Sequence, residues 1–313
     1  MSAPHGNRGS PAPNSAGEFT VRAAERTLEL GARPVLMGIV NASPDSFSDD
    51  GTLVTVEDRV RLARELCDAG AEIVDVGGES ATTGSAPVDV ELEIERVVPL
   101  VRRVSTFAIV SVDTYKPAVA RAAIAAGASI VNDVSGLRDR ELASVCADTG
   151  AALVVMHTRA APRERLQDPE LYDDVIEDVL AFLRERTALA LSLGVAREQL
   201  IVDPGPDFAK TPAQTIALLS QLHRLHELAL PLLLAVSRKD FVGALTGRAP
   251  RERLAGTLAA LAHGVDAGAH IVRVHDVAAA ADFLAVRAAL SGSAPPGRDL
   301  ALAEELRHER RSV

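Results

Sequence analysis

Eight short apolar segments recur along this chain, and each runs directly into polar residues at its C-terminal end. The segments are residues 35–40, 73–76, 108–112, 130–131, 153–156, 201–202, 232–236 and 271–274. The polar clusters behind them bring together carboxylates, amides, hydroxyl groups and cations. In a closed parallel sheet all strands end on one face, where such sheets carry their functional groups. The repeated pattern therefore predicts one polar face that gathers side chains from the whole chain.

Helical patterns separate the apolar segments, and several of them end at a glycine. They predict helices over residues 56–69, 90–104, 117–126, 137–149, 172–193, 211–228, 252–267 and 278–290. Strand–helix alternation is typical of an α/β protein with a parallel sheet. Repetition of the unit favours closure into a single-domain (β/α)8 TIM barrel, with an open doubly wound sheet as the alternative. No Gly-x-Gly-x-x-Gly or Walker A motif follows a strand, so a nucleotide-binding fold loses support.

The barrel is expected to span residues 21–290. Residues 1–20 are rich in Ser, Pro, Gly and Asn and predict a disordered extension, and residues 291–313 predict a surface tail. The extension lacks the apolar core of a signal peptide, and no apolar run approaches the ~20 residues that span a bilayer. We therefore expect a cytoplasmic protein with no membrane partner.

Composition narrows the function classes further. Hydrophobic residues make up 47% of the 313 residues, which is ample for one large core. The net charge is −10, and no basic stripe could neutralise nucleic-acid phosphates, so we exclude a general nucleic-acid partner. The two cysteines, Cys67 and Cys146, have no metal-ligand neighbours and predict free thiols.

Carboxylates and an amide follow three of the apolar segments. Asp113, Asn132 and Asp203 stand at the ends of the third, fourth and sixth segments. Held together in a barrel mouth, such groups can hydrogen-bond the edge of a nitrogen heterocycle, because a carboxylate accepts from ring N–H and amino groups while an amide both donates and accepts. Taken singly, each could instead satisfy backbone amides.

Basic residues follow the last two segments. Arg238 and Lys239 come after the seventh, and Arg273 and His275 lie in and after the eighth. In a (β/α)8 barrel these two strand ends commonly supply a phosphate site. Arg273 could hold a phosphate bidentately, while Lys239 would act as a point charge or form a structural salt bridge.

The polar stretch after the first segment is long, covering residues 41–51 with bend residues Pro44 and Gly51. A loop of this kind can fold over a ligand. Asn41 could offer its carbonyl to a cation or its amide to a phosphate, and Phe47 could stack on a flat ligand. His157, after the fifth segment, could line the mouth or serve the structure alone.

In their order along the chain, these clusters resemble the sequence blocks of the dihydropteroate synthase family. The matching blocks are residues 41–51, 75–80, 111–114, 132–133, 156–157, 203–205, 237–239 and 273–276. The resemblance extends from about residue 34 to 285, and its first and last blocks are the most specific.

The resemblance implies a transferase of folate biosynthesis. Enzymes of this family join p-aminobenzoate to 6-hydroxymethyl-7,8-dihydropterin diphosphate and release pyrophosphate, with Mg²⁺. The positions that match the pterin pocket are Asp113, Asn132, Asp203 and Lys239. Those that match the diphosphate and metal sites are Asn41, the implied metal ligand, Arg273 and His275, and those near p-aminobenzoate are Phe47, Phe208 and Ser237. The resemblance also implies a homodimer.

The chain departs from the family pattern on the p-aminobenzoate side. Ala81-Thr82-Thr83 stands where Thr-Arg-Pro is usual, Asp50 replaces a glycine, and residues 206–210 replace Ile-Gly-Phe-Gly-Lys. A divergent pterin-binding paralogue with lost or altered amine-substrate activity is therefore the main alternative. A corrinoid-type pterin-binding methyltransferase module would leave the basic cluster unexplained.

Overall fold

The computed structural model describes residues 17–31, 33–43, 55–79, 87–303 and 306. Within them the chain forms an eight-stranded sheet whose order is β8-β7-β6-β5-β4-β3-β10-β9, with every pairing parallel. The strands are β3 (Val35–Asn41), β4 (Ile73–Gly77), β5 (Ile109–Asp113), β6 (Ile130–Asp133), β7 (Ala152–Met156), β8 (Leu200–Asp203), β9 (Leu233–Leu234) and β10 (Ile271–Val274).

The sheet closes on itself. A parallel bridge joins Val202 of β8 to Leu232, the residue before β9, so the two ends of the strand order meet. Neighbours in the sheet follow one another along the chain, without the reversal of strand order that a doubly wound sheet has. The prediction of a (β/α)8 barrel is confirmed, and the open-sheet alternative is wrong.

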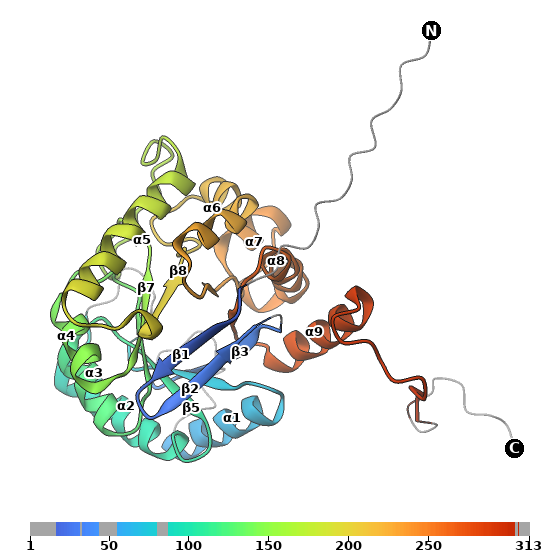
Figure 1. Ribbon diagram of the computed structural model, residues 1–313, viewed down its shortest axis with the longest axis horizontal. Coiled ribbons are helices and arrows are strands. Elements are labelled where there is room, and N and C mark those ends of the chain that lie inside the picture. Colours follow the sequence, from blue (N-terminus) through green and yellow to red (C-terminus); the bar gives the residue numbers. More distant parts are fainter. Residues whose placement is uncertain (1–16, 32, 44–54, 80–86, 304–305, 307–313) are drawn as a thin grey trace, which may run out of the picture.

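Helices form a ring around the strands (Figure 1). They are α1 (Val56–Asp68), α2 (Val90–Val104), α3 (Pro117–Ala125), α4 (Glu141–Thr149), α5 (Val175–Ser192), α6 (Pro212–Ser220), α7 (Asp240–Thr246), α8 (Leu254–Asp266) and α9 (Val277–Ser291). The described residues also include the 3₁₀ turns η1 (Arg197–Gln199), η2 (Leu222–Leu228) and η3 (Pro250–Glu252).

Local capping chemistry explains where several helices begin. Thr55 and Asp58 exchange hydrogen bonds at the start of α1 in a capping box. Asp174 accepts from the amides of Ile176 and Glu177, so α5 begins at residue 175 and the predicted start at 172 is wrong. The single helix predicted over residues 211–228 is also wrong, because α6 ends at Ser220 and η2 follows it.

An antiparallel hairpin absent from the sequence-based prediction closes one end of the barrel. It consists of β1 (Phe19–Ala23) and β2 (Arg26–Leu30) and begins inside the 1–20 stretch. Its inner face packs on the barrel interior, and the buried side chains of that layer are Val21, Ala23, Leu28, Leu30, Val35, Met37, Ile73, Ile130, Ala152, Val154, Ile201, Leu233, Ala235 and Ile271.

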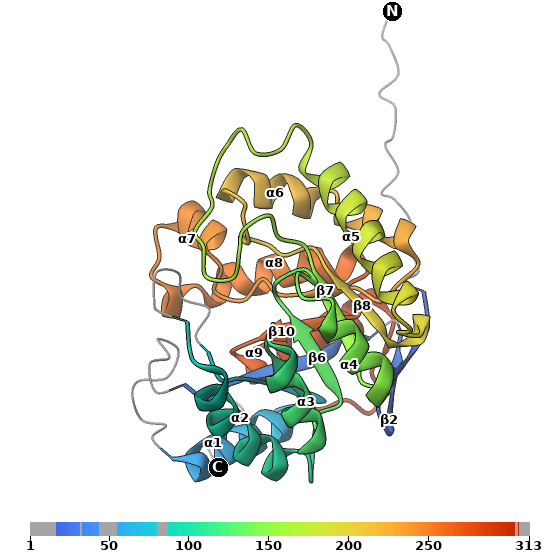
Figure 2. The same ribbon diagram turned by 90° about the vertical axis from the view of Figure 1, so that its left-hand side faces the viewer.

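The hairpin lies at the N-terminal ends of the strands. Ala24 donates its amide to the Gly150 carbonyl just before β7, and Arg22 hydrogen-bonds Gln199 just before β8. Figure 2 shows the hairpin on one side of the barrel, with the segment between β7 and α5 reaching towards the other. The strand C-termini are therefore left as the polar face. None of the helices in the described residues is long and apolar enough to cross a membrane.

Candidate active site at the C-terminal ends of the strands

A chain of polar contacts crosses the barrel interior at the strand ends. Arg273 on β10 donates from Nε to Asp75 Oδ2 on β4 (2.6 Å) and from a terminal nitrogen to Asp113 Oδ2 on β5 (2.9 Å). Asn132 on β6 donates its amide to Asp75 Oδ2 (3.2 Å), and its Cα is the register partner of Asp113. Four side chains from four strands thus form one connected network.

Asp75 is the member of this network that sequence reasoning did not assign to the site. It is fully buried in the middle of β4, and its second oxygen, Oδ1, has no hydrogen-bond partner among the described residues. The available signal was a carboxylate inside an otherwise apolar segment. An acid in that position needs a cation or strong donors, because an unpaired buried carboxylate is costly.

The protein shifts the ionisation of the carboxylates at this face. Burial raises the pKa of Asp113 to about 7, although the neighbouring Arg273 pulls in the opposite direction. Burial likewise raises the pKa of Asp203, opposed by the Gly205 amide, which donates to its Oδ1 at 2.7 Å. For Arg273, burial disfavours the charged form, but Asp75 and Asp113 outweigh it and the pKa is raised.

His275 lies at the end of β10 next to Ser237. Ser237 Oγ is 3.0 Å from His275 Nδ1 and accepts the His275 backbone amide at 3.2 Å. Burial, with Arg238 and Arg273 nearby, lowers the pKa of His275 to about 3. The imidazole is therefore neutral at physiological pH. In the tautomer in which Ser237 Oγ donates to Nδ1, the ring proton lies on Nε2.

A second group of residues surrounds Phe208 in the turn after β8. Lys239 Nζ lies 4.2 Å from the centroid of the Phe208 ring, a cation–π distance. Burial lowers the pKa of Lys239, against the pull of Asp207 and Asp203. Arg238, which the sequence placed with the anion-binding residues, instead forms an ion pair with Asp276 (2.7 Å).

The turn that carries Phe208 has a strained backbone. Gly205, Asp207 and Ala209 all have positive φ, at 62°, 65° and 51°. A Cβ on Gly205 would lie 2.1 Å from the His157 carbonyl oxygen, so the chain needs glycine there. This backbone bends the chain back over the end of β8 and projects Phe208 towards Lys239.

Lys210 lies buried under this turn and stabilises it by hydrogen bonds. The sequence had given it no role. Its fully buried Nζ contacts His157 Nδ1 (2.8 Å) and the carbonyls of Gly205 (2.9 Å) and Phe208 (3.0 Å). His157 in turn contacts Asp178 through Nε2 (2.8 Å). His157 is fully buried and supports the turn. Of the two roles considered from the sequence, lining the barrel mouth or a structural role, the structure favours the second.

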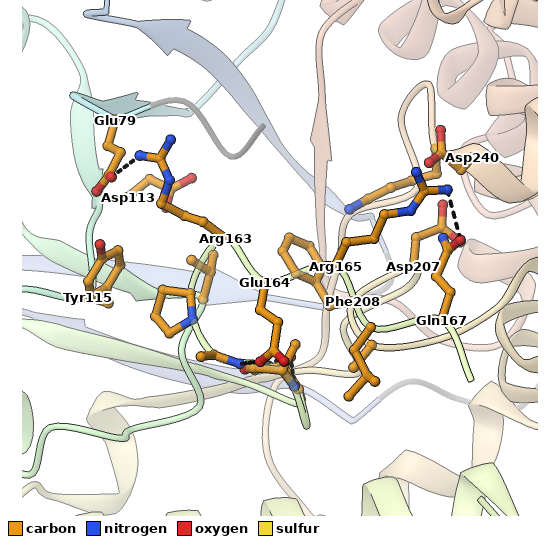
Figure 3. Close-up of a pocket in the computed structure, with 18 of the residues that line it drawn as sticks. Glu79, Asp113, Tyr115, Arg163, Glu164, Arg165, Gln167, Asp207, Phe208 and Asp240 are labelled. Carbon is orange, nitrogen blue, oxygen red and sulfur yellow. Dashed lines mark hydrogen bonds and ion pairs between the residues drawn. The ribbon is translucent and has the colours of Figure 1, made fainter. Parts of the chain in front are cut away.

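A cavity of about 530 Å³ opens over this face (Figure 3). Asp113, Phe208 and Lys239 line it, and Arg273 and Asn132 connect to it through their contacts with Asp113 and Asp75. Asn41 is the last residue of β3, the strand that pairs with β4. Its backbone carbonyl accepts a hydrogen bond from Arg59 Nε (2.9 Å). Phe47 lies outside the described residues.

The segment between β7 and α5, residues 157–174, supplies much of the remaining cavity wall and was missed as part of the site. Its Arg163 forms an ion pair with Glu79 from the end of β4, and both side chains are buried. Lys116 also contacts Glu79 (2.9 Å) and reaches Glu93 (2.6 Å). The signal in the sequence was a long polar connection that contains three arginines.

No group of three or more His, Cys, Asp or Glu side chains able to hold a metal ion occurs in the part of the chain that the structure describes.

Comparison with known proteins agrees with this geometry. The family model "Pterin binding enzyme" matches residues 37–275. Dihydropteroate synthase of Escherichia coli K12 is 42% identical over 248 residues, which are 79% of this chain and 88% of that protein. Dihydropteroate synthase of Bacillus subtilis is 40% identical over 254 residues, covering 80% and 86% of the two chains.

Solved structures extend the likeness to the fold. A Xanthomonas albilineans dihydropteroate synthase with 4-aminobenzoic acid superposes with a TM-score of 0.81 at 42% identity, covering 90% of this chain and 100% of that one. The same organism's enzyme in complex with 7,8-dihydropteroate gives 0.77 at 41% identity, over 88% and 100% of the chains. With its barrel, its polar face and these relatives in agreement, the chain belongs to the dihydropteroate synthase family.

Proposed function

We propose that the polar network and the Phe208 turn are the two halves of one active site, one for the pterin diphosphate and one for p-aminobenzoate. The activity of a dihydropteroate synthase is the transfer of a pterinylmethyl group to an arylamine, in folate biosynthesis. The observation that supports the division is the contact chain Asn132–Asp75–Arg273–Asp113, which joins four strands and meets the cavity at Asp113.

The pterin ring is assigned to the deep end. Asp113 and Asp203 would accept hydrogen bonds from the ring N–H and amino groups, while Asn132 both donates and accepts. Lys239 would approach the carbonyl side of the ring. Asn132 and Asp203 are buried and Asp113 is partly buried, which strengthens such bonds because few waters compete with the ligand for them.

The diphosphate is assigned to Arg273 and His275. The bonds of Arg273 to Asp75 and Asp113 use Nε and one terminal nitrogen, and the second terminal nitrogen is the group proposed for a diphosphate oxygen. In the tautomer with its proton on Nε2, the neutral His275 would donate a hydrogen bond to the diphosphate. Both groups face the charge that develops as the carbon–oxygen bond breaks, which is the usual source of large electrostatic catalysis.

p-Aminobenzoate is assigned to the Phe208 side, against the ring and the Lys239 stem, with Ser237 nearby and Phe47 as a proposed contact from outside the described residues. The arylamine nitrogen is already nucleophilic, so the reaction needs no strong general base. As the methylene of the pterin turns cationic, ionised Asp113 and Asp203 would stabilise it, and the amine then forms the new carbon–nitrogen bond.

The residues fit a Mg²⁺ ion that arrives with the diphosphate. Mg²⁺ commonly keeps several waters and binds through substrate phosphates with one or two protein oxygens. Asn41, at the end of β3, is the residue proposed to offer its side-chain oxygen. Such an ion would withdraw negative charge from the leaving diphosphate.

Pyrophosphate release tests the proposal most directly. Purified protein, pterin diphosphate and Mg²⁺ are incubated with and without p-aminobenzoate, and we expect release that depends on the amine. Calorimetric binding of the pterin without release would instead support the divergent paralogue. We also propose a cytoplasmic homodimer; sedimentation at several protein concentrations tests the dimer, and a monomer at all of them would contradict it.

A further inference from the structure

Two neighbouring turns carry basic residues of the polar face. The β9 turn, residues 235–239, leads into α7, and the β10 turn, residues 275–276, leads into α9. The two turns lie side by side, because β9 and β10 pair in the sheet. Each carries one residue that is assigned to the ligand, Lys239 on the β9 turn and His275 on the β10 turn. Whatever fixes one turn against the other therefore affects the site.

Arg238 and Asp276 join the two turns by a bidentate ion pair. Arg238 donates from Nε to Asp276 Oδ2 (3.1 Å) and from a terminal nitrogen to Asp276 Oδ1 (2.7 Å). Two parallel bonds fix the orientation of both groups as well as their separation. The side chains are 19% and 29% exposed, so solvent screens the pair only in part.

The backbone of Arg238 is held at both of its polar groups. Its amide donates to Thr257 Oγ1 on α8 (3.0 Å), and its carbonyl accepts from Arg253 (2.8 Å). Arg253 also donates to the Lys239 carbonyl (3.1 Å). Arg238 has a positive φ of 58°, a conformation that persists only where surrounding contacts determine it. These contacts fix the direction in which its side chain leaves the backbone, and that direction leads to Asp276.

Arg238 lines the cavity, and two roles are open to it: it could bind a ligand itself or hold the residues that do. A direct role would require the guanidinium to leave Asp276, and the partly buried carboxylate would then lose its partner. The second role requires no rearrangement. Arg238 lies between Ser237 and Lys239 in the chain, and its partner directly follows His275. The contacts favour the second role.

We propose that Arg238 and Asp276 are a positioning pair for the reaction, which keeps Lys239 and His275 at a fixed separation while the pterin diphosphate is bound and cleaved. The inference rests on the proposed function, which assigns Lys239 to the pterin ring and His275 to the diphosphate. One ligand spans both residues, so a change in their separation would misalign one of its ends. Small misalignments of reacting groups reduce rates strongly.

A double-mutant cycle tests whether the pair acts as a unit. Arg238→Gln and Asp276→Asn each remove the charge of one member, and turnover is followed as pyrophosphate release with Mg²⁺ and p-aminobenzoate. We expect each variant to lower kcat/KM for the pterin diphosphate about 30-fold, mainly through kcat, because the ligand binds but is held out of alignment. The double variant should also lie about 30-fold below the unmodified chain, since the second substitution removes an interaction that is already lost.

The same variants distinguish positioning from direct binding. If Arg238 bound the ligand itself, Arg238→Gln would lower kcat/KM while Asp276→Asn left it within about threefold of the unmodified chain. That pattern would overturn the proposal, as would losses that multiply in the double variant. Arg238→Lys keeps the charge without the two parallel bonds, and should recover part of the turnover.

A second ion pair in the same part of the barrel controls for folding. Arg287 on α9 donates from Nε to Asp266 Oδ1 at the end of α8 (3.1 Å), so it joins the helices that flank β10 on its N-terminal side. Arg287→Gln should leave kcat/KM within about twofold. A loss as large as that in Arg238→Gln would show a general loosening of the barrel and would overturn the positioning role.

A binding measurement separates the pair from the reaction. Calorimetric titration with the pterin diphosphate and Mg²⁺, without the amine, should give a Kd about threefold weaker in each single variant and in the double variant. Coupled losses of this kind, in a chain that releases no pyrophosphate, would reject the proposed function and retain the pair. Equal Kd and kcat values in all variants would overturn the pair and leave the proposed function in place.

Discussion

Arg273 Nε lies 2.6 Å from Asp75 Oδ2, although the two residues stand on strands separated by β3. Arg273 is in register with Met37 of β3, and Asp75 is in register with Ile39. The side chains therefore meet inside the barrel, across the strand between them. This contact fixes the guanidinium before any ligand arrives, which is the condition for electrostatic catalysis without reorganisation.

The geometry of Arg273 should matter more than its charge. We expect Arg273→Lys to lower kcat/KM for pterin diphosphate by about 100-fold, because lysine cannot bridge two carboxylates and still reach an anion in the same plane. Arg102→Lys, on α2, is the control and should change it less than about twofold. Equal effects of the two substitutions would remove Arg273 from the site.

Asp113 should give the reaction a pH dependence. Its native pKa, about 7, lies above the usual 3.8, so the carboxylate forms as the pH rises through neutrality. We expect kcat/KM to rise between about pH 6 and 8, since the ionised form stabilises the cationic methylene. In Asp113→Asn the activity should be lower, and the pH dependence that remains should be that of the substrate's own diphosphate. Profiles of the same shape in both proteins would contradict this role.

Lys210 should tie stability to pH. Burial lowers its native pKa to about 7 from 10.5, so between these values the unfolded chain binds more protons than the folded one and stability rises with pH. Lys210→Met should cost about 2–4 kcal/mol near neutrality, because three buried acceptors lose their donor. The deficit relative to the unmodified chain should widen towards pH 9, as urea unfolding at two pH values would reveal; a constant deficit would contradict the shift.

The buried ion pair between Glu79 and Arg163 should contribute more to the free energy of unfolding than an exposed ion pair does. We expect Glu79→Gln to destabilise the protein by about 3 kcal/mol, because Arg163 and Lys116 both lose the charge of Glu79, while Lys116 keeps its contact with Glu93. Arg163→Gln should cost less, since Glu79 keeps Lys116 and the Val88 amide. A double-mutant cycle by chemical unfolding measures the coupling, and purely additive losses would show that the pair does not act as a unit.

Gly205 and Gly247 both have a positive φ but differ in the space around them, so their alanine variants can be compared. Gly205→Ala should destabilise the protein by more than about 3 kcal/mol, because the left-handed conformation is joined by collision with the His157 carbonyl. Gly247→Ala has a similar φ of 70° with no atom within 4 Å of the new Cβ, and should cost about 1 kcal/mol. Thermal unfolding compares them; similar losses would show that the turn can relax.

The strand ends were predictable because a closed parallel sheet fixes where they meet. Asp113, Asn132 and Arg273 follow from that topology alone, and the structure brings them into one network. Asp75 lies within an apolar segment, as Arg273 does, and was not assigned to the site because nothing local shows that these two side chains meet. The roles given to the site residues, with Phe47 among them, stay predictions.

The parts that the sequence did not predict lie in segments without a hydrophobic pattern typical of helices or strands. Arg163 and Arg165 stand in a connection whose path depends on contacts with Glu79, Gln214 and Ala209, all distant in sequence. Lys210 appeared to be one more polar residue in a turn, and nothing local reveals that it is buried under that turn. The hairpin of β1 and β2 was too short to recognise beside the disordered extension expected there.

The hairpin of β1 and β2 covers one end of the barrel. Val21, Ala23, Leu28 and Leu30 pack against residues of the barrel strands and close the N-terminal end of the barrel, so the interior opens only at its C-terminal end. On the proposed assignment the pterin binds deepest, so it would enter before the amine, and the product would leave with its amine end first. The order of binding would then follow from the closed end of the barrel, opposite the proposed site.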